Sequence, residues 1–188
     1  DENPKTILRL LDMGAQGIQV PHIAGAEGAR KAVEAVRYPP LGNRGGAGSS
    51  RAAGYGAVPW QEHMRTSNEE ILLIVMTEDK QGLAEISDIA AVDGVDLIAL
   101  GPTDISAALG ITDPADPSLK ETFKELAAKV KAVGKAGVYI PVNHAACRFT
   151  PQDLLKMGVN YSSVAPAPQT IVLNALKASA KNIREEVT

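Results

Sequence analysis

The sequence is poor in cysteine, in positive charge and in long apolar runs, and each shortage excludes a class of protein. Cys147 is the only cysteine, so no disulfide can form within the chain, and a reducing, cytoplasmic location is the simplest expectation. The longest apolar run, 71–76, is far too short to cross a bilayer, so no membrane partner is expected. The net charge of −3 argues against nucleic acid as a partner, because a mildly acidic surface does not attract phosphates.

The chain instead contains short apolar runs that alternate with amphipathic, helix-like stretches. The runs that predict buried strands are 18–20, 71–76, 97–100, 138–142 and 161–164. No hairpin signal separates them, so we expect an all-parallel α/β sheet in a single domain, 1–188. A closed (β/α)8 TIM barrel needs eight βα units and about 250 residues. We therefore expect about five units of such a barrel, with the amino-terminal units missing, because the first element is a capped helix.

Two of the predicted strands end at an acid. Glu78 follows the run 71–76, and Asp104 follows the run 97–100. Parallel neighbours would bring both acids to the carboxyl edge of the sheet, where ligands bind in such folds. Each acid alone can be explained as a helix-start residue, and Asp79 is interpreted in that way. Together, two converging carboxylates favour a bound hard cation, Mg²⁺ or Mn²⁺.

A long loop rich in glycine and proline, 37–57, carries three arginines. Arg44 lies between Asn43 and two glycines, so we expect it above the strand ends, where a guanidinium would bind a carboxylate or an enolate oxygen. Arg37 and Arg51 are expected to face solvent. The segment GNRGGAG lacks the terminal Lys-Ser/Thr of a phosphate loop and follows no strand, so nucleotide binding is disfavoured.

Two of the three histidines follow a predicted strand. His22 and His144 are therefore placed at the ligand edge, whereas His63 lies in a polar helix. Either of the first two could instead be a capping or surface group, and His22 is preferred as the one that contacts the ligand. No lysine closes a strand, which disfavours a Schiff-base mechanism.

Four segments taken in order resemble the HpcH/HpaI family of metal-dependent pyruvate aldolases. They are GAQGIQVP, RYPPLGNRGG, the strand that closes on Glu78, and GVDLIALGPTDISAALG, and the similarity covers residues 5 to about 165. The resemblance implies a TIM barrel whose fourth to eighth strands are present here, and a homo-oligomer. It also implies that Glu78 and Asp104 bind the metal and that Arg44 stabilises the enolate. The family's Asp-Gly-Glu-His segment, which supplies the general base, is absent.

The expected function is that of a class II aldolase, which cleaves a 2-oxo-4-hydroxy acid into pyruvate and an aldehyde. A divalent metal polarises the 2-oxo group, and the substrate carboxylate lies at the start of the helix near Asp104. Without the family's base, the 188-residue chain is expected to lack turnover unless another group replaces that base. Two alternatives stay open: a carbon–carbon lyase acting on acyl-CoA thioesters, and a non-catalytic barrel fragment that binds metal and oxo acid. The expected site residues are Glu78 and Asp104 for the metal, Arg44 and His22 for catalysis, and Arg44, Gly101, Pro102 and Thr103 for the substrate.

Overall fold

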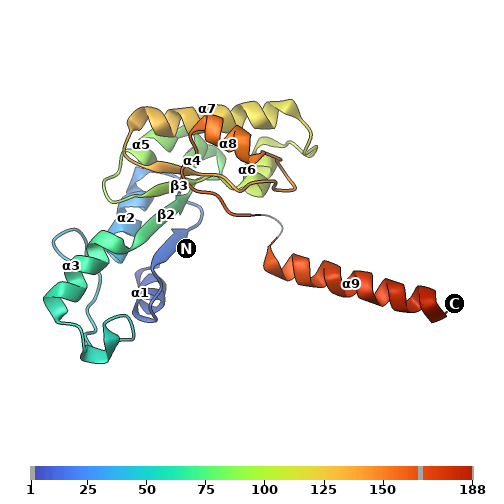
Figure 1. The fold of residues 1–188 in the computed structure, drawn as a ribbon. Helices are drawn as coiled ribbons and strands as arrows, with labels where there is room; N and C mark the ends of the chain where they lie inside the picture. The colour runs from blue at the N-terminus through green and yellow to red at the C-terminus, as the bar shows by residue number, and fades with distance from the viewer. Residues whose placement is uncertain (1–2, 165–166, 188) are drawn as a thin grey trace.

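A four-stranded parallel sheet, in the order β1-β2-β3-β4, forms the centre of the fold (Figure 1). The computed structural model describes residues 3–164 and 167–187. The strands are β1 (Gly17–Val20), β2 (Leu72–Met76), β3 (Leu97–Ala99) and β4 (Gly137–Tyr139). Every pairing is parallel, so the predicted α/β fold class with a parallel sheet is confirmed.

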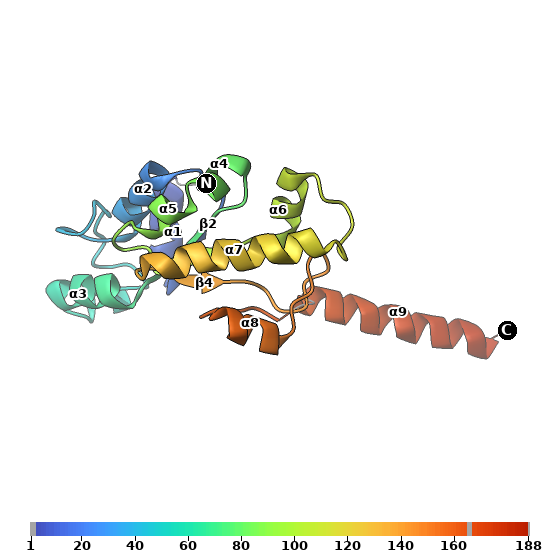
Figure 2. The same ribbon diagram turned by 90° about the horizontal axis from the view of Figure 1, so that it is seen from above.

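The helices that cover the sheet lie on one of its faces. Helix α1 packs beside α2, α2 beside α5, and α5 beside α7, which also contacts β4 (Figures 1 and 2). A single helical layer is the arrangement of a barrel wall, where helices cover only the outside. The helices are α1 (Pro4–Asp12), α2 (Ala26–Val36), α3 (Trp60–Glu70), α4 (Lys80–Ala84), α5 (Ile86–Ala90), α6 (Pro102–Leu109), α7 (Pro117–Val133), α8 (Pro151–Met157) and α9 (Pro168–Val187), with a 3-10 turn η1 (Gly54–Gly56).

Side chains alternate across the sheet and bury both faces, as continuous apolar runs predict. Leu73 and Val75 of β2 point to the helical layer and belong to the main core. Ile74 points the other way and joins Leu97 and Ala99 in a second, smaller cluster. The face away from the helices is therefore also apolar over its centre.

The fifth predicted strand, 161–164, is wrong as a continuous strand. It makes two isolated parallel bridges, between Tyr139 and Tyr161 and between Val142 and Val164. The side chain of Asn160 accepts the Val138 N–H at 3.0 Å, which gives that backbone donor a partner outside a regular ladder.

A buried arginine holds the amino ends of two strands, although the sequence predicted that it would face solvent. Arg37 is 4% exposed. Its guanidinium donates to the carbonyls of Ile71 (2.6 Å) and Gly94 (3.2 Å) and to the carboxylate of Asp96 (2.9 Å). The same carboxylate oxygen of Asp96 accepts the Leu73 N–H at 2.7 Å. These bonds fix β2 against β3 at the edge opposite to Glu78.

The last helix, α9, extends away from the sheet and its helical layer in both views (Figures 1 and 2). Its exposed apolar side chains are Ile171, Val172, Leu173 and Leu176. Of the described residues, none belongs to a helix that is both long and apolar enough to span a membrane.

Candidate metal and oxo-acid site

Strand register brings the two predicted metal ligands to the same edge. Met76 pairs with Ala99, and the Thr77 N–H donates to the Ala99 carbonyl at 3.1 Å, so Glu78 lies level with Gly101. Gly101 is the N-cap of α6, and Asp104 lies in the first turn of that helix. The chain therefore delivers one carboxylate from the end of β2 and the other from the helix that follows β3.

Both carboxylates face a small space beside the Gly101 backbone. A Cβ atom built on Gly101 would lie 2.6 Å from Glu78 Oε2 and 3.7 Å from Asp104 Oδ2. Glu78 is only 3% exposed. Burial raises the pKa of Glu78 above its ordinary value and the charge of Asp104 raises it further, while the nearby His22 lowers it. A group that binds between these oxygens and carries positive charge would remove the cost of holding them together.

One oxygen of this pair has no partner among the described residues. Glu78 Oε2 is buried and accepts no hydrogen bond. A buried carboxylate oxygen is costly to leave unsatisfied, and oxygen donors are the ligands that Mg²⁺ and Mn²⁺ prefer. Among the described residues, no group of three or more histidine, cysteine or acidic side chains is placed so that all of them could hold one metal ion. A divalent ion would thus fit with two protein ligands, leaving its other positions to water and substrate.

His22 lies against Glu78, as expected for a residue that follows β1. Its Nδ1 atom is 3.3 Å from Glu78 Oε1, while its side chain is 70% exposed. Its φ angle is 58°, a left-handed conformation that costs energy in a residue with a side chain. The next residue, Ile23, donates its N–H to the Met76 carbonyl at 2.9 Å and anchors the loop to β2. The strained backbone directs the imidazole toward the acid.

A cavity of about 250 Å³ opens beside Asp104, and we call it the Asp104 cavity. It contains the predicted substrate-binding residues Gly101, Pro102 and Thr103. It also contains His144 and two residues that the sequence analysis did not single out, Tyr139 and Ser163. No sequence pattern distinguished them, since Tyr139 lies within the apolar run 138–142 and Ser163 directly follows another serine. The lining residues are Gln19, Met76, Ala99, Leu100, Gly101, Pro102, Thr103, Asp104, Tyr139, Pro141, His144 and Ser163.

The expectation that Arg44 lies above the carboxyl ends of the strands is wrong. Its side chain is fully buried, with Nη2 3.1 Å from Asp12 Oδ1 and the guanidinium carbon 4.4 Å from the Tyr38 ring centroid. It lines a separate cavity of about 270 Å³ that includes Gln16 and Ile71, the residues that directly precede β1 and β2. Arg44 is thus at the amino edge, away from Glu78 and Asp104.

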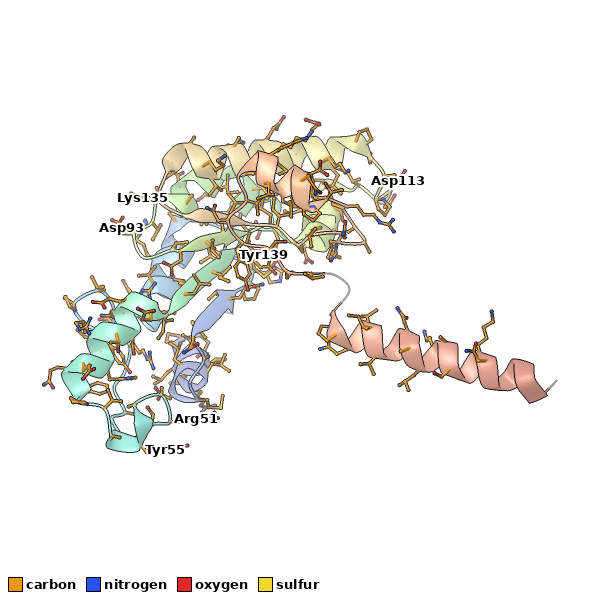
Figure 3. The ribbon with its side chains drawn as sticks, viewed as in Figure 1. Arg51, Tyr55, Asp93, Asp113, Lys135 and Tyr139 are labelled. Carbon is orange, nitrogen blue, oxygen red and sulfur yellow. The ribbon has the colours of Figure 1, made fainter. Side chains whose placement is uncertain are left out.

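The physical reason is the path of the loop after α2. That helix ends at the amino edge, and the loop folds back on its last turn: the Asn43 N–H donates to the Glu34 carbonyl (2.7 Å), and the Arg44 N–H to the Arg37 carbonyl (3.0 Å). On the lower left of Figure 3, the labelled loop residues Arg51 and Tyr55 lie beside α1, far from Tyr139 of β4. Among the described residues that line the Asp104 cavity there is no arginine.

A family model of HpcH/HpaI aldolase/citrate lyase matches residues 2–166, nearly the whole chain. The chain belongs to the HpcH/HpaI aldolase/citrate lyase family. It is 37% identical over 164 residues to a 2-keto-3-deoxy-L-rhamnonate aldolase of Klebsiella pneumoniae, which covers 86% of this chain and 59% of that protein. It is 42% identical over 132 residues to a hydroxypyruvate/pyruvate aldolase of Sagittula stellata, covering 70% of this chain and 51% of that protein. The chain thus spans a little over half the length of these curated relatives.

Two solved structures share the fold. An HpcH/HpaI aldolase/citrate lyase family protein of Burkholderia cenocepacia superposes with a TM-score of 0.78 at 29% identity, covering 97% of this chain and 70% of that one. The citrate synthase SbnG gives a TM-score of 0.76 at 28% identity, with coverages of 97% and 69%.

Proposed function

We propose that this HpcH/HpaI chain supplies the metal- and pyruvate-binding side of a divalent-metal-dependent aldolase, which cleaves 2-oxo-4-hydroxy acids into pyruvate and an aldehyde. The observation that carries this proposal is the pair of Glu78 and Asp104. Glu78 is buried with one oxygen unpartnered, and its pKa is raised by burial and by the second carboxylate. A purely structural acid would have a hydrogen-bond donor in that place.

Glu78 and Asp104 would hold Mg²⁺ or Mn²⁺, which when bound supplies Lewis-acid polarisation of the 2-oxo group. Glu78 is held rigidly because it is buried, and Asp104 is more exposed and lines the cavity. The pair would thus present one fixed ligand and one that is accessible from the substrate side.

The substrate carboxylate would lie at the start of α6. Thr103 and Asp104 are the second and third residues of this helix, so their backbone N–H groups have no acceptor within it. Pro102, the first residue of the helix, has no backbone N–H that would need an acceptor. Free N–H groups and the positive end of the helix dipole favour an anion at this point.

His22 is proposed as the group that takes the proton of the 4-hydroxyl. Its Nδ1 atom faces Glu78, so the hydrogen of the neutral ring belongs on Nδ1 and the lone pair on Nε2. Nε2 of an exposed side chain can then accept a proton from a bound hydroxyl. Arg44 has no part in the proposed mechanism, because it lies at the opposite edge of the sheet.

The test is metal binding together with pyruvate release. The titration of Mn²⁺ into the chain should give one site, and Glu78→Gln and Asp104→Asn should each weaken it strongly. Asp79→Asn is the matched control, since it removes an adjacent charge but keeps an N-cap for the Gly82 N–H, which Asp79 now binds at 2.7 Å. Equal Mn²⁺ affinity in all four proteins would refute the site.

Pyruvate release from 4-hydroxy-2-oxopentanoate, followed by a coupled assay with and without Mn²⁺, tests the reaction itself. Stimulation by Mn²⁺ that Glu78→Gln abolishes would support the proposal. If Mn²⁺ bound normally and no pyruvate formed, the chain would instead be a binding module. Assembly as a homo-oligomer and location in the cytoplasm stay predictions of the sequence and its family resemblance.

A further inference from the structure

The buried guanidinium of Arg44 has donors that no described residue accepts. Its Nη2 atom donates to Asp12 Oδ1 at 3.1 Å, but Nε and Nη1 are buried without a hydrogen-bond partner. Arg37 is equally buried, at 4% exposed, yet both of its Nη atoms donate to carbonyl or carboxylate oxygens. Buried donors of a charged group are costly to leave unpaired. Arg44 therefore differs from an arginine whose role is structural alone.

The unpaired donors border the 270 Å³ cavity at the amino edge, which we call the Arg44 cavity. Gln16 lies on the strand side of this cavity, and His63 and Ser67 of α3 lie on the helix side. His63 and Ser67 are both buried. The cavity is a little smaller than the pockets that hold drug-sized ligands, which start near 300 Å³. Its size suits a small organic ion.

An aromatic cluster keeps the guanidinium in place. The guanidinium carbon of Arg44 lies 4.4 Å from the centroid of the Tyr38 ring. That ring lies edge-on against Trp60 and His63, with centroid distances of 5.3 and 5.8 Å. Cation–π contact and burial together oppose any movement of the charge toward solvent. An acceptor for Nε or Nη1 must therefore enter the Arg44 cavity.

We propose that the Arg44 cavity binds a small monocarboxylate, whose oxygens accept hydrogen bonds from the nitrogens that Asp12 leaves free. An anion is favoured because the guanidinium stays charged and offers donors only. A single negative charge is favoured over two because Asp12 already offsets part of the positive charge and Glu70 also lines the cavity. The site lies at the edge opposite to Glu78 and Asp104, so this proposal is independent of the aldolase function.

The experiment uses the fluorescence of Trp60, the only tryptophan in the sequence. Neighbouring side chains cover both free nitrogens, so a ligand that reaches them must shift the aromatic cluster and change the Trp60 emission. Sodium acetate is titrated into the metal-free chain at pH 7, with sodium chloride at the same ionic strength as the reference and phosphate as a second anion. We expect saturation with a Kd on the order of 1 mM, which one or two charge-assisted hydrogen bonds would supply. The Tm should rise with acetate over the same range.

Three variants distinguish the Arg44 cavity from general anion effects. Arg44→Met removes the donors, and Ser67→Leu fills the cavity but keeps Arg44 and Asp12; each should weaken acetate binding at least about tenfold. Arg65→Met is the matched control, since it removes an exposed arginine of the same helix that pairs with Glu69. If Arg44→Met does not fold, Ser67→Leu decides the question.

Saturable binding of acetate that Ser67→Leu weakens and Arg65→Met preserves would support the proposal. Phosphate binding as tight as that of acetate would overturn the assignment to monocarboxylates. A response to acetate no larger than that to chloride would overturn the site as a whole, because water alone would then occupy the cavity. Neither result changes the standing of the Glu78 and Asp104 site, which is tested by Mn²⁺ binding.

Discussion

Replacement of Gly101 by alanine tests the geometry of the carboxylate pair with a single methyl group. The added Cβ would lie 2.6 Å from Glu78 Oε2, whereas ordinary contacts begin near 3.4 Å, so the carboxylate must move by roughly 0.8 Å. Metal–oxygen distances tolerate only about 0.2 Å. Because Glu78 is buried, it has little room to restore the geometry by rotating. We expect Gly101→Ala to weaken Mn²⁺ binding by about 10- to 100-fold, the usual cost of disturbing the support of a metal ligand.

The same change should leave the fold intact. Gly101 has φ −81° and ψ 107°, which alanine adopts without strain, and the loss of a glycine from the unfolded chain adds about 0.4–1 kcal/mol of stability. Calorimetric titration should therefore show weaker Mn²⁺ binding by Gly101→Ala. Urea unfolding should show a free energy of unfolding that is equal to or slightly above that of the wild type. Gly48→Ala is the matched control, because its Cβ would make only an ordinary 3.7 Å contact with Trp60. Wild-type Mn²⁺ affinity in Gly101→Ala would refute the placement of the ion between Glu78 and Asp104.

Three further predictions concern the rest of the molecule. Burial, assisted by the charge of Arg44, lowers the pKa of His63, so the unfolded chain binds more protons and stability should rise with pH up to about 6.5. Urea unfolding at several pH values should show this slope in the wild type and a flatter one in His63→Phe; equal slopes would contradict the assignment. Asp12→Ala leaves the buried Arg44 guanidinium without its carboxylate and should cost about 3 kcal/mol of unfolding free energy, with recovery in the double variant Asp12→Ala/Arg44→Met; no recovery would mean that Asp12 acts otherwise. Thr150→Ala removes the capping box of α8 and should cost about 1 kcal/mol by the same measurement, whereas Thr150→Ser should cost little.

The sequence predicted the strands and their edge well because both depend on local pattern. The apolar run before Glu78 is a buried strand, and parallel pairing then places the acids that follow β2 and β3 on one edge. The path of a loop is a different matter. Nothing in the composition of 37–57 tells whether the chain crosses to the ligand edge or folds back, and the backbone bond from Asn43 to Glu34 decides it. For that reason Arg44 was assigned to the wrong edge and Arg37 to the wrong environment.

Strand 161–164 shows a second limit of the sequence pattern. It is short and ends in an apolar residue like a strand, but pairing with β4 depends on whether the backbone N–H groups of β4 are free to bond to it. Asn160 takes the Val138 N–H with its side chain, and only isolated bridges follow. The positions of Tyr139, His144 and Ser163 around the Asp104 cavity could not be predicted from the pattern either. They depend on a hydrogen bond between residues distant in the chain and on the shape of one turn.

The bonds of Arg37 and Asp96 align β2 and β3 at their amino ends, whereas the residues of the candidate site lie at the carboxyl ends of the same strands. Because their bonds set how β2 and β3 line up at the amino edge, the alignment does not depend on the residues at the opposite ends. Loops at the carboxyl edge can therefore change length or side chains over evolutionary time without displacing Glu78 relative to Gly101. Loss of Arg37 or Asp96 would have the opposite effect, since it would remove the bonds that align β2 with β3. Engineers who wish to alter what binds at the carboxyl edge should accordingly vary the loops there and leave Arg37 and Asp96 untouched.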